Sequence, residues 1–143
     1  MKRFIVFIIA MGLVLVACGQ DTAEENPNST KARVYSHSWD GNPVTVEKRN
    51  TEGNYEIIHE ITDADEVEKL IEALGNADWE ENVKVDIAPP DYSFTWNNYN
   101  HSVWVNEGSE RLELMIEGQS NYGTLSKTPS ELVFEILTGE PLK

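Results

Sequence analysis

The chain has a single cysteine, Cys18, and this residue closes an apolar stretch near the N-terminus. The four residues that end with it read Leu15-Val16-Ala17-Cys18, the arrangement of a bacterial lipobox. A diacylglyceryl group can alkylate a thiol at this point, and cleavage before Cys18 then leaves a lipidated N-terminal residue. Two acyl chains, at about 0.8 kcal/mol for each buried CH₂, hold a protein stably at a membrane. The sequence therefore predicts lipidation at Cys18.

The residues before the cysteine have the proportions of a signal peptide. Met1-Lys2-Arg3 is basic, and residues 4–16 are apolar or small. A transmembrane helix needs about twenty apolar residues, so this stretch is too short to remain as a span. An ordinary secretory signal would need no cysteine at its cleavage site. We therefore predict a lipoprotein signal peptide over residues 1–17.

A polar segment follows the lipobox. Residues 19–31 contain Pro27 and one aliphatic residue, Ala23, and are otherwise polar, charged or glycine. Such a composition cannot bury enough apolar surface to fold, which is typical of a flexible tether. We assign residues 18–32 to the lipidated cysteine and its tether, and residues 33–143 to one small domain.

The charge of the mature chain excludes some classes of partner. Removal of residues 1–17 takes away Lys2 and Arg3 and leaves 9 basic and 25 acidic side chains, a formal net charge of −16. Nucleic acids and anionic bilayers both require a cationic face, so the domain is not expected to bind either directly. Contact with the membrane is expected through the lipid on Cys18. Cations and basic partners remain open as ligands, although a solvated acidic surface is the favoured explanation of the charge.

Other residues that could carry chemistry form no recognisable set. His37, His59 and His101 lie on three separate segments without metal-ligand spacing. The sequence has no nucleophile elbow, P-loop or dinucleotide fingerprint, and the domain has no cysteine for thiol catalysis. A pair of carboxylates acting as in a glycosidase would not be recognisable in so acidic a chain. We predict no catalytic residues, no metal and no cofactor.

Two segments have the periodicity of amphipathic helices. Residues 62–76 carry an apolar stripe after an acidic first turn, with Thr62 or Asp63 as the N-cap. The stripe consists of Val67, Leu70, Ile71 and Leu74. Residues 128–138 begin with the pattern of a capping box and predict a second helix.

Short β-prone runs separated by turn-forming residues predict the strands. They cover residues 33–38, 44–49, 55–61, 83–87, 92–96, 102–106 and 112–116. Residues 78–81 are predicted to be an acidic turn and residues 118–123 a loop, with 124–125 adding a few paired residues. The expected fold is an α+β domain in the order β-β-β-α-β-β-β-β-α, with both helices on one face of a largely antiparallel sheet.

Aromatic side chains are the one feature with a functional alternative. Four of them, Tyr92, Phe94, Trp96 and Trp104, fall on adjacent predicted strands, where they form either the core or an exposed surface that grips a sugar or a peptide. Core packing is favoured because so small a domain needs large buried side chains. The candidates for partner contact are Trp39 and Tyr122 in predicted loops, and Trp39 is favoured.

Several short motifs together resemble the YhfM-like lipoproteins of Bacillus-type, Gram-positive bacteria. They are the lipobox, the Tyr35-to-Trp39 segment, the Ile-Thr-Asp-x-x-Glu helix start at residues 61–66, and Pro90-Asp91-Tyr92. The resemblance spans about residues 33–138. It implies an extracytoplasmic lipoprotein domain on the outer face of the cell membrane, without an established activity and without catalytic residues to carry over.

Three functions remain open at this point. The favoured one is a non-enzymatic, lipid-anchored module that binds an envelope protein or a cell-wall component. The second is an envelope hydrolase that uses a carboxylate pair with one raised pKa. The third is a sensor of a small ligand or a cation, which would have a pocket and would melt at a ligand-dependent temperature.

Overall fold

The structure is a computed structural model that describes residues 29–84 and 87–143. The predicted signal peptide, the lipobox at residues 15–18 and most of the predicted tether lie outside these residues. No helix in the described ranges is long and apolar enough to cross a membrane. The elements are η1 (Lys31–Tyr35), β1 (Val44–Arg49), β2 (Tyr55–Ile61), α1 (Ala64–Gly75), β3 (Asp78–Glu81), β4 (Tyr92–Trp96), β5 (Tyr99–Asn106), β6 (Arg111–Ile116), β7 (Asn121–Thr124) and α2 (Lys127–Thr138).

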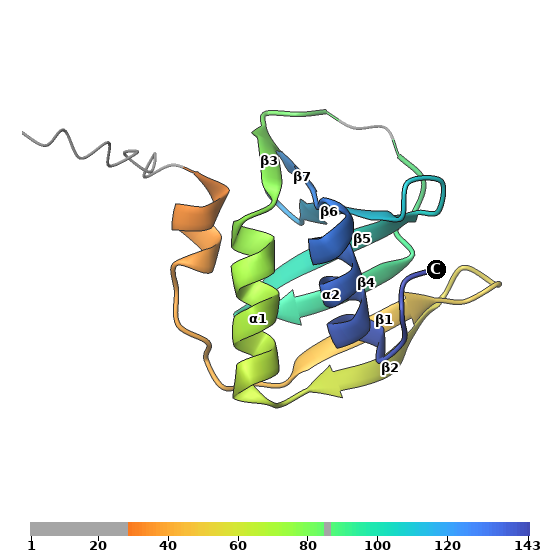
Figure 1. Cartoon of the computed structure of the whole chain (residues 1–143), viewed down its shortest axis with the longest axis horizontal. Helices are drawn as coiled ribbons and strands as arrows, with labels where there is room; N and C mark the ends of the chain where they lie inside the picture. The colour runs from red at the N-terminus through yellow and green to blue at the C-terminus, as the bar shows by residue number, and fades with distance from the viewer. Residues whose placement is uncertain (1–28, 85–86) are drawn as a thin grey trace, which may run out of the picture.

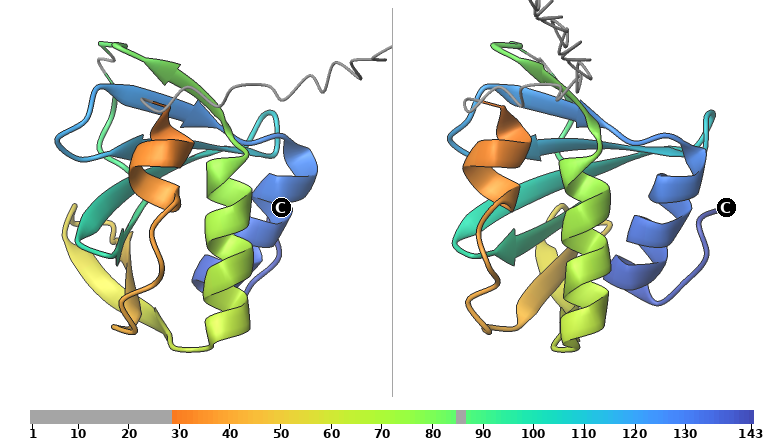
Figure 2. Two further views of the ribbon diagram at one scale, coloured as in Figure 1. Left: turned by 90° about the vertical axis from the view of Figure 1, so that its left-hand side faces the viewer. Right: turned by 60° about the vertical axis from the view of Figure 1, so that its left-hand side comes forward.

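The strands form one antiparallel sheet in the order β2-β1-β4-β5-β6-β7-β3. Helix α1 joins the two edge strands, β2 and β3, by crossing one face of the sheet. Helix α2 lies beside α1 on the same face, and η1 lies on the other side of α1 (Figures 1 and 2). We call this the covered face and the opposite side of the sheet the open face. The predicted α+β class, with helices on one face of an antiparallel sheet, is confirmed.

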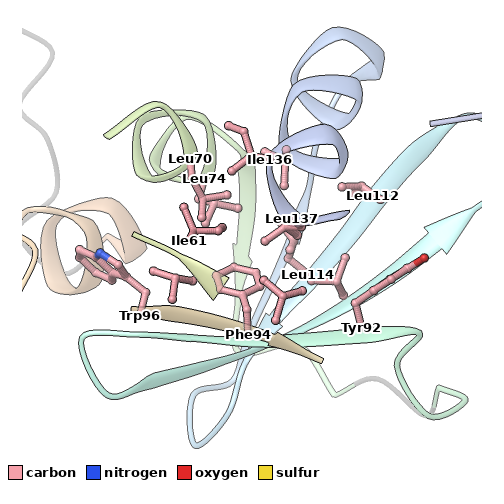
Figure 3. Packing of buried hydrophobic residues seen from close by; sticks show 14 of the residues in the cluster. Ile61, Leu70, Leu74, Tyr92, Phe94, Trp96, Leu112, Leu114, Ile136 and Leu137 are labelled. Atoms are coloured by element: carbon pink, nitrogen blue, oxygen red, sulfur yellow. The ribbon is translucent and has the colours of Figure 1, made fainter. Parts of the chain in front are cut away.

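The core lies between the covered face and the helices. Alternation along β4 points Tyr92, Phe94 and Trp96 inward, where each is buried (Figure 3). Core packing is therefore the correct alternative for these three aromatic residues. Trp104 differs: it lies on the open face, half-buried, and its indole N–H donates to the carbonyl of Ala88 at 2.6 Å.

Helix α1 forms largely as its sequence predicts. Asp63 is the N-cap, and its carboxylate accepts hydrogen bonds from the backbone N–H groups of Asp65 and Glu66. Val67, Leu70 and Leu74 of the predicted stripe are buried, and Ile71 is half-buried. Figure 3 shows Leu70 and Leu74 on the side of α1 toward Ile136 of α2. Leu70 and Leu74 thus pack toward α2 and the sheet.

The predicted strand over residues 33–38 is wrong. Its first residues belong to the short helix η1, so β1 has no earlier strand beside it and pairs with β2 and β4. Val34 and Tyr35 are adjacent, and both are buried, which a helical turn allows and a half-exposed strand does not. The turn begins at Ser29, whose carbonyl accepts from the backbone N–H of Arg33 at 2.9 Å.

The position of the strand after α1 also differs from the prediction. Strand β3 occupies the predicted acidic turn at Asp78–Glu81, whereas Val83 and Lys84 lie outside strands. Trp79 explains the shift: its indole N–H donates to the carbonyl of Leu74 at 2.7 Å, and its ring covers Gly123 of β7. A Cβ at Gly123 would lie 2.8 Å from that ring, so only glycine fits. The acidic residues of β3 are exposed at the sheet edge.

Two further local predictions need correction. Residues 121–124 form β7, so the loop predicted over residues 118–123 ends earlier than expected. The capping box predicted at residues 128–131 does not form, because α2 begins at Lys127 with Ser126 at the N-cap position and no side-chain capping bond. The Ser130 hydroxyl is buried, accepts from the backbone N–H of Leu112 and donates to the carbonyl of Leu125, which ties α2 to the sheet.

Packing of the domain begins at Thr30, ahead of the predicted boundary at residue 33. Thr30 is buried, and its hydroxyl accepts a hydrogen bond from Asn121 Nδ2 at 2.6 Å. The contact joins residues 91 positions apart and fixes the start of η1 against β7.

Candidate functional site

A groove of about 670 Å³ runs along α1 on the side away from α2. Its second wall is the segment from η1 to Trp39, and we call it the η1–α1 groove. At one end, η1 packs on Gly75 of α1, where a Cβ would make an ordinary contact with Lys31 Cγ at 3.4 Å. The residues that line the groove are Lys31, Tyr35, His37, Ser38, Trp39, Ala64, Val67, Glu68, Ile71, Glu72, Gly75, Asn76 and Trp96.

The wall that carries Trp39 is held by the turn between β4 and β5. Asn97 has a positive φ of 46°, and its side-chain amide donates to the carbonyl of Ser38 at 2.6 Å and accepts from the backbone N–H of Asp40 at 2.8 Å. The Trp39 indole donates to the carbonyl of Asn42 at 2.9 Å. Trp39 therefore contributes a fixed aromatic surface, which reduces the entropy lost on binding.

Trp96, one of the residues that line the groove, has a polar atom without a partner. Trp96 is 1% exposed, and its indole Nε1 is buried with no hydrogen-bond acceptor. The other three tryptophans of the chain all donate to a backbone carbonyl. Their acceptors are Asn42 for Trp39, Leu74 for Trp79 and Ala88 for Trp104. Because a buried unpaired donor costs about 1–3 kcal/mol, a ligand acceptor that reached this N–H through a small opening of the groove lining would recover that cost.

A buried tyrosine–histidine pair fixes η1 to the sheet. His101 Nδ1 lies 3.0 Å from the carbonyl of Tyr99, which can only accept, so this nitrogen carries the proton. His101 Nε2 then accepts from the Tyr35 hydroxyl at 2.9 Å, and the imidazole stacks on Phe94 with ring centroids 4.4 Å apart. Burial lowers the pKa of His101 to about 4 and raises the pKa of Tyr35 well above its ordinary value. The pair is neutral and structural at physiological pH.

The rim of the groove carries more negative than positive charge. Glu68 and Glu72 stand one helical turn apart on the exposed surface of α1. Lys31 also lines the groove, and its Nζ donates to Asn76 Oδ1 at 3.4 Å. His37 donates to the carbonyl of Arg33 at 3.0 Å. Together with the acidic balance of the whole chain, this rim favours neutral or cationic ligands over anionic ones.

The two predicted contact residues do not come together. Trp39 lines the groove on the covered side, whereas Tyr122 lies on β7, half-buried on the open face beside Met115 and Glu80. Burial and the neighbouring Glu113 carboxylate raise the pKa of Tyr122 to about 12. Tyr122 is thus a residue of a strand and not of the loop that its sequence predicts.

The histidines occupy three different environments. His37 is exposed after η1, His59 is half-buried in β2, and His101 is buried in β5. Among the residues that the structure describes, no group of three or more histidine, cysteine, aspartate or glutamate side chains is arranged to hold a metal ion.

Two features of the groove, the Tyr35–His101 hydrogen bond and the unpaired Trp96 indole, cannot be predicted from the sequence pattern. The Tyr35–His101 hydrogen bond joins residues 66 positions apart, so no local sequence pattern predicts it. The unpaired indole of Trp96 depends on what its neighbours leave open. The Asn97-Asn98 dipeptide was a usable signal, because two asparagines with positive φ mark a tight hairpin turn that can hold another segment.

Fold and groove together define a small α+β domain with one covered and one open sheet face and a ligand-sized groove beside its central helix. The chain belongs to the YhfM family: the family model described as YhfM protein matches residues 41–141. The match includes α1 and Trp96 and begins two residues after Trp39. No curated protein and no solved structure matches the sequence.

Proposed function

We propose that this chain is a lipid-anchored, extracytoplasmic binding module without catalytic activity, and that the η1–α1 groove is its binding site. The observation that carries the proposal is the groove itself, whose lining includes Trp96, a residue with a buried indole N–H that has no partner. A ligand with an apolar body and a hydrogen-bond acceptor, such as a carbonyl, fits both the indole and the aromatic walls.

Anchoring rests on the sequence of residues 1–18 and has its own test. Mass spectrometry of the membrane fraction should find a diacylglyceryl-modified N-terminal Cys18, and Cys18→Ser should abolish the modification and leave an uncleaved precursor. An unmodified Cys18 inside an intact N-terminus, or a mature chain released without lipid, would contradict the anchor.

Binding can be tested with N-acetyl-phenylalanine amide, a neutral probe with one ring and two carbonyl acceptors. We expect saturable thermal stabilisation of the full chain in detergent micelles. Trp39→Ala should weaken this response by at least about fivefold, since it removes one aromatic wall. Tyr122→Ala is the matched control, because it truncates another half-buried aromatic residue far from the groove.

Two outcomes of this experiment would count against the groove. In the first, the probe gives no saturable change in melting temperature. In the second, Trp39→Ala and Tyr122→Ala weaken the response equally, which would place the binding elsewhere or make it nonspecific.

A further inference from the structure

Strand β2 forms one edge of the sheet and exposes an unusual amount of apolar surface. Among the described residues it pairs only with β1. Tyr55 is 36% exposed, Ile57 62% and Ile58 43%. Only two other large apolar side chains of the described chain are comparably exposed, and they lie apart, in a loop and on α2. The exposed apolar residues are therefore concentrated at this edge.

A β-bulge brings the two isoleucines to the edge together. Glu47 of β1 pairs with Ile57 and the preceding Val46 pairs with His59, so Ile58 is the extra residue. The strand contains neither proline nor lysine, the residues that most often protect an exposed edge. It does contain two exposed glutamates, Glu56 and Glu60, on either side of the isoleucines.

The glutamates argue against a second copy of this chain as the occupant. Two copies paired through β2 would bring four carboxylates, those of Glu56 and Glu60 of each copy, to one edge. Like charges gathered at one interface repel each other. The acidic balance of the chain adds repulsion between copies.

We propose that β2 accepts an extended segment of a partner protein as an added strand, and that this segment carries apolar residues between basic ones. Its backbone would continue the sheet beyond β2, which is a common mode of peptide recognition. Its apolar side chains would cover Ile57 and Ile58, and its lysine or arginine side chains would pair with Glu56 and Glu60. The surface is separate from the η1–α1 groove.

The test uses the full chain in detergent micelles and three acetylated, amidated peptides. The first alternates valine and threonine with lysine at both ends, the second has glutamate in place of lysine, and the third has proline at its centre. We expect the lysine peptide to bind at least about tenfold more tightly than either of the others, and to protect backbone amides of β2 from hydrogen exchange.

The double variant Glu56→Lys/Glu60→Lys should remove the preference for the lysine peptide. Glu131→Lys/Glu135→Lys, which reverses two exposed charges on α2, is the control with the same net charge and should retain the preference. Equal effects of the two variants would show that overall charge alone causes the preference for the lysine peptide, and would overturn the proposal.

Two results on the unmodified chain would also overturn it. One is tight binding of the proline peptide or an absence of amide protection in β2, since either excludes strand addition. The other is self-association through β2 in sedimentation experiments, which would make a second copy the occupant. Both results are measured on the unmodified chain, so neither depends on the folding of a variant.

Discussion

Helix α1 has a neighbour on each side, and the two sides differ. Toward α2, buried leucines and isoleucines from both helices close the space, and the remaining surface hollow measures about 270 Å³. Toward η1, the groove measures about 670 Å³ and is lined in part by Trp96, whose buried indole N–H has no partner. Helix α1 thus has a packed interface with α2, which we call the packed seam, on one side and the open η1–α1 groove on the other.

The difference follows from what each neighbour contributes. Helix α2 has three turns and presents a stripe with the same period as that of α1, so the two surfaces interlock. The helix η1 has five residues, of which only Val34 and Tyr35 are buried, and the chain then leaves α1 toward Trp39. The α2 side is built for stability, and the η1 side leaves room for a ligand.

The largest effect is expected in the packed seam. Leu70→Ala should lower the free energy of unfolding by about 4 kcal/mol, because Leu70 is fully buried and its loss leaves a cavity. Ile71→Ala, on the half-buried groove wall, should cost about 1 kcal/mol. Urea denaturation measures both. Similar losses at the two positions would remove the distinction between seam and groove.

Acid should weaken the protein through His101. The pKa of His101 is about 4 in the folded chain and 6.5 when it is exposed, so the unfolded chain takes up the proton first as the pH falls. The stabilisation is complete above pH 6.5 and is lost between pH 6.5 and 4, with a total of about 3 kcal/mol. Urea titrations of the wild type and His101→Gln should show a flatter curve for the variant. Parallel curves would contradict a neutral buried imidazole.

Trp96→Phe tests whether the indole N–H or the volume of the side chain determines binding in the groove. The variant should bind N-acetyl-phenylalanine amide about fivefold more weakly, the loss of one hydrogen bond, and should bind propylbenzene, which has no acceptor, nearly as before. Trp79→Phe, whose indole already has a carbonyl partner, is the control. Calorimetry measures the affinities. If both probes lose affinity to the same extent, then volume and not hydrogen bonding determines binding.

The smallest effect is expected at the ion pair between η1 and β3. Arg33 lies 3.3 Å from Glu81, and both side chains are more than one-third exposed. Arg33→Ala should therefore change the free energy of unfolding by at most about 0.5 kcal/mol at low salt and by less at high salt. A loss comparable to that of Leu70→Ala would show that η1 is held by charge.

The sequence predicts the fold where its pattern is local and repeats. The stripe of α1, its Asp63 cap and the alternation of β4 are of this kind, and each forms. Prediction fails where a distant contact decides. Trp79 turns an acidic segment into a strand by packing on Gly123, and the bonds to Asn121 and His101 fix η1 where a strand is expected. Of the residues that line the groove, only Trp39 is proposed from the sequence as a contact residue, and the groove itself is not predicted.

The central claim is that a ligand acceptor reaches the Trp96 indole in the η1–α1 groove. A ¹⁵N–¹H spectrum of the full chain in micelles resolves its four indole N–H groups individually, and titration with N-acetyl-phenylalanine amide tests the claim. We predict saturable shifts of the Trp96 and Trp39 signals, with the Trp104 signal on the open face unchanged. Unchanged Trp96 and Trp39 signals up to the solubility limit of the probe, or a shift of Trp104 alone, would contradict the account.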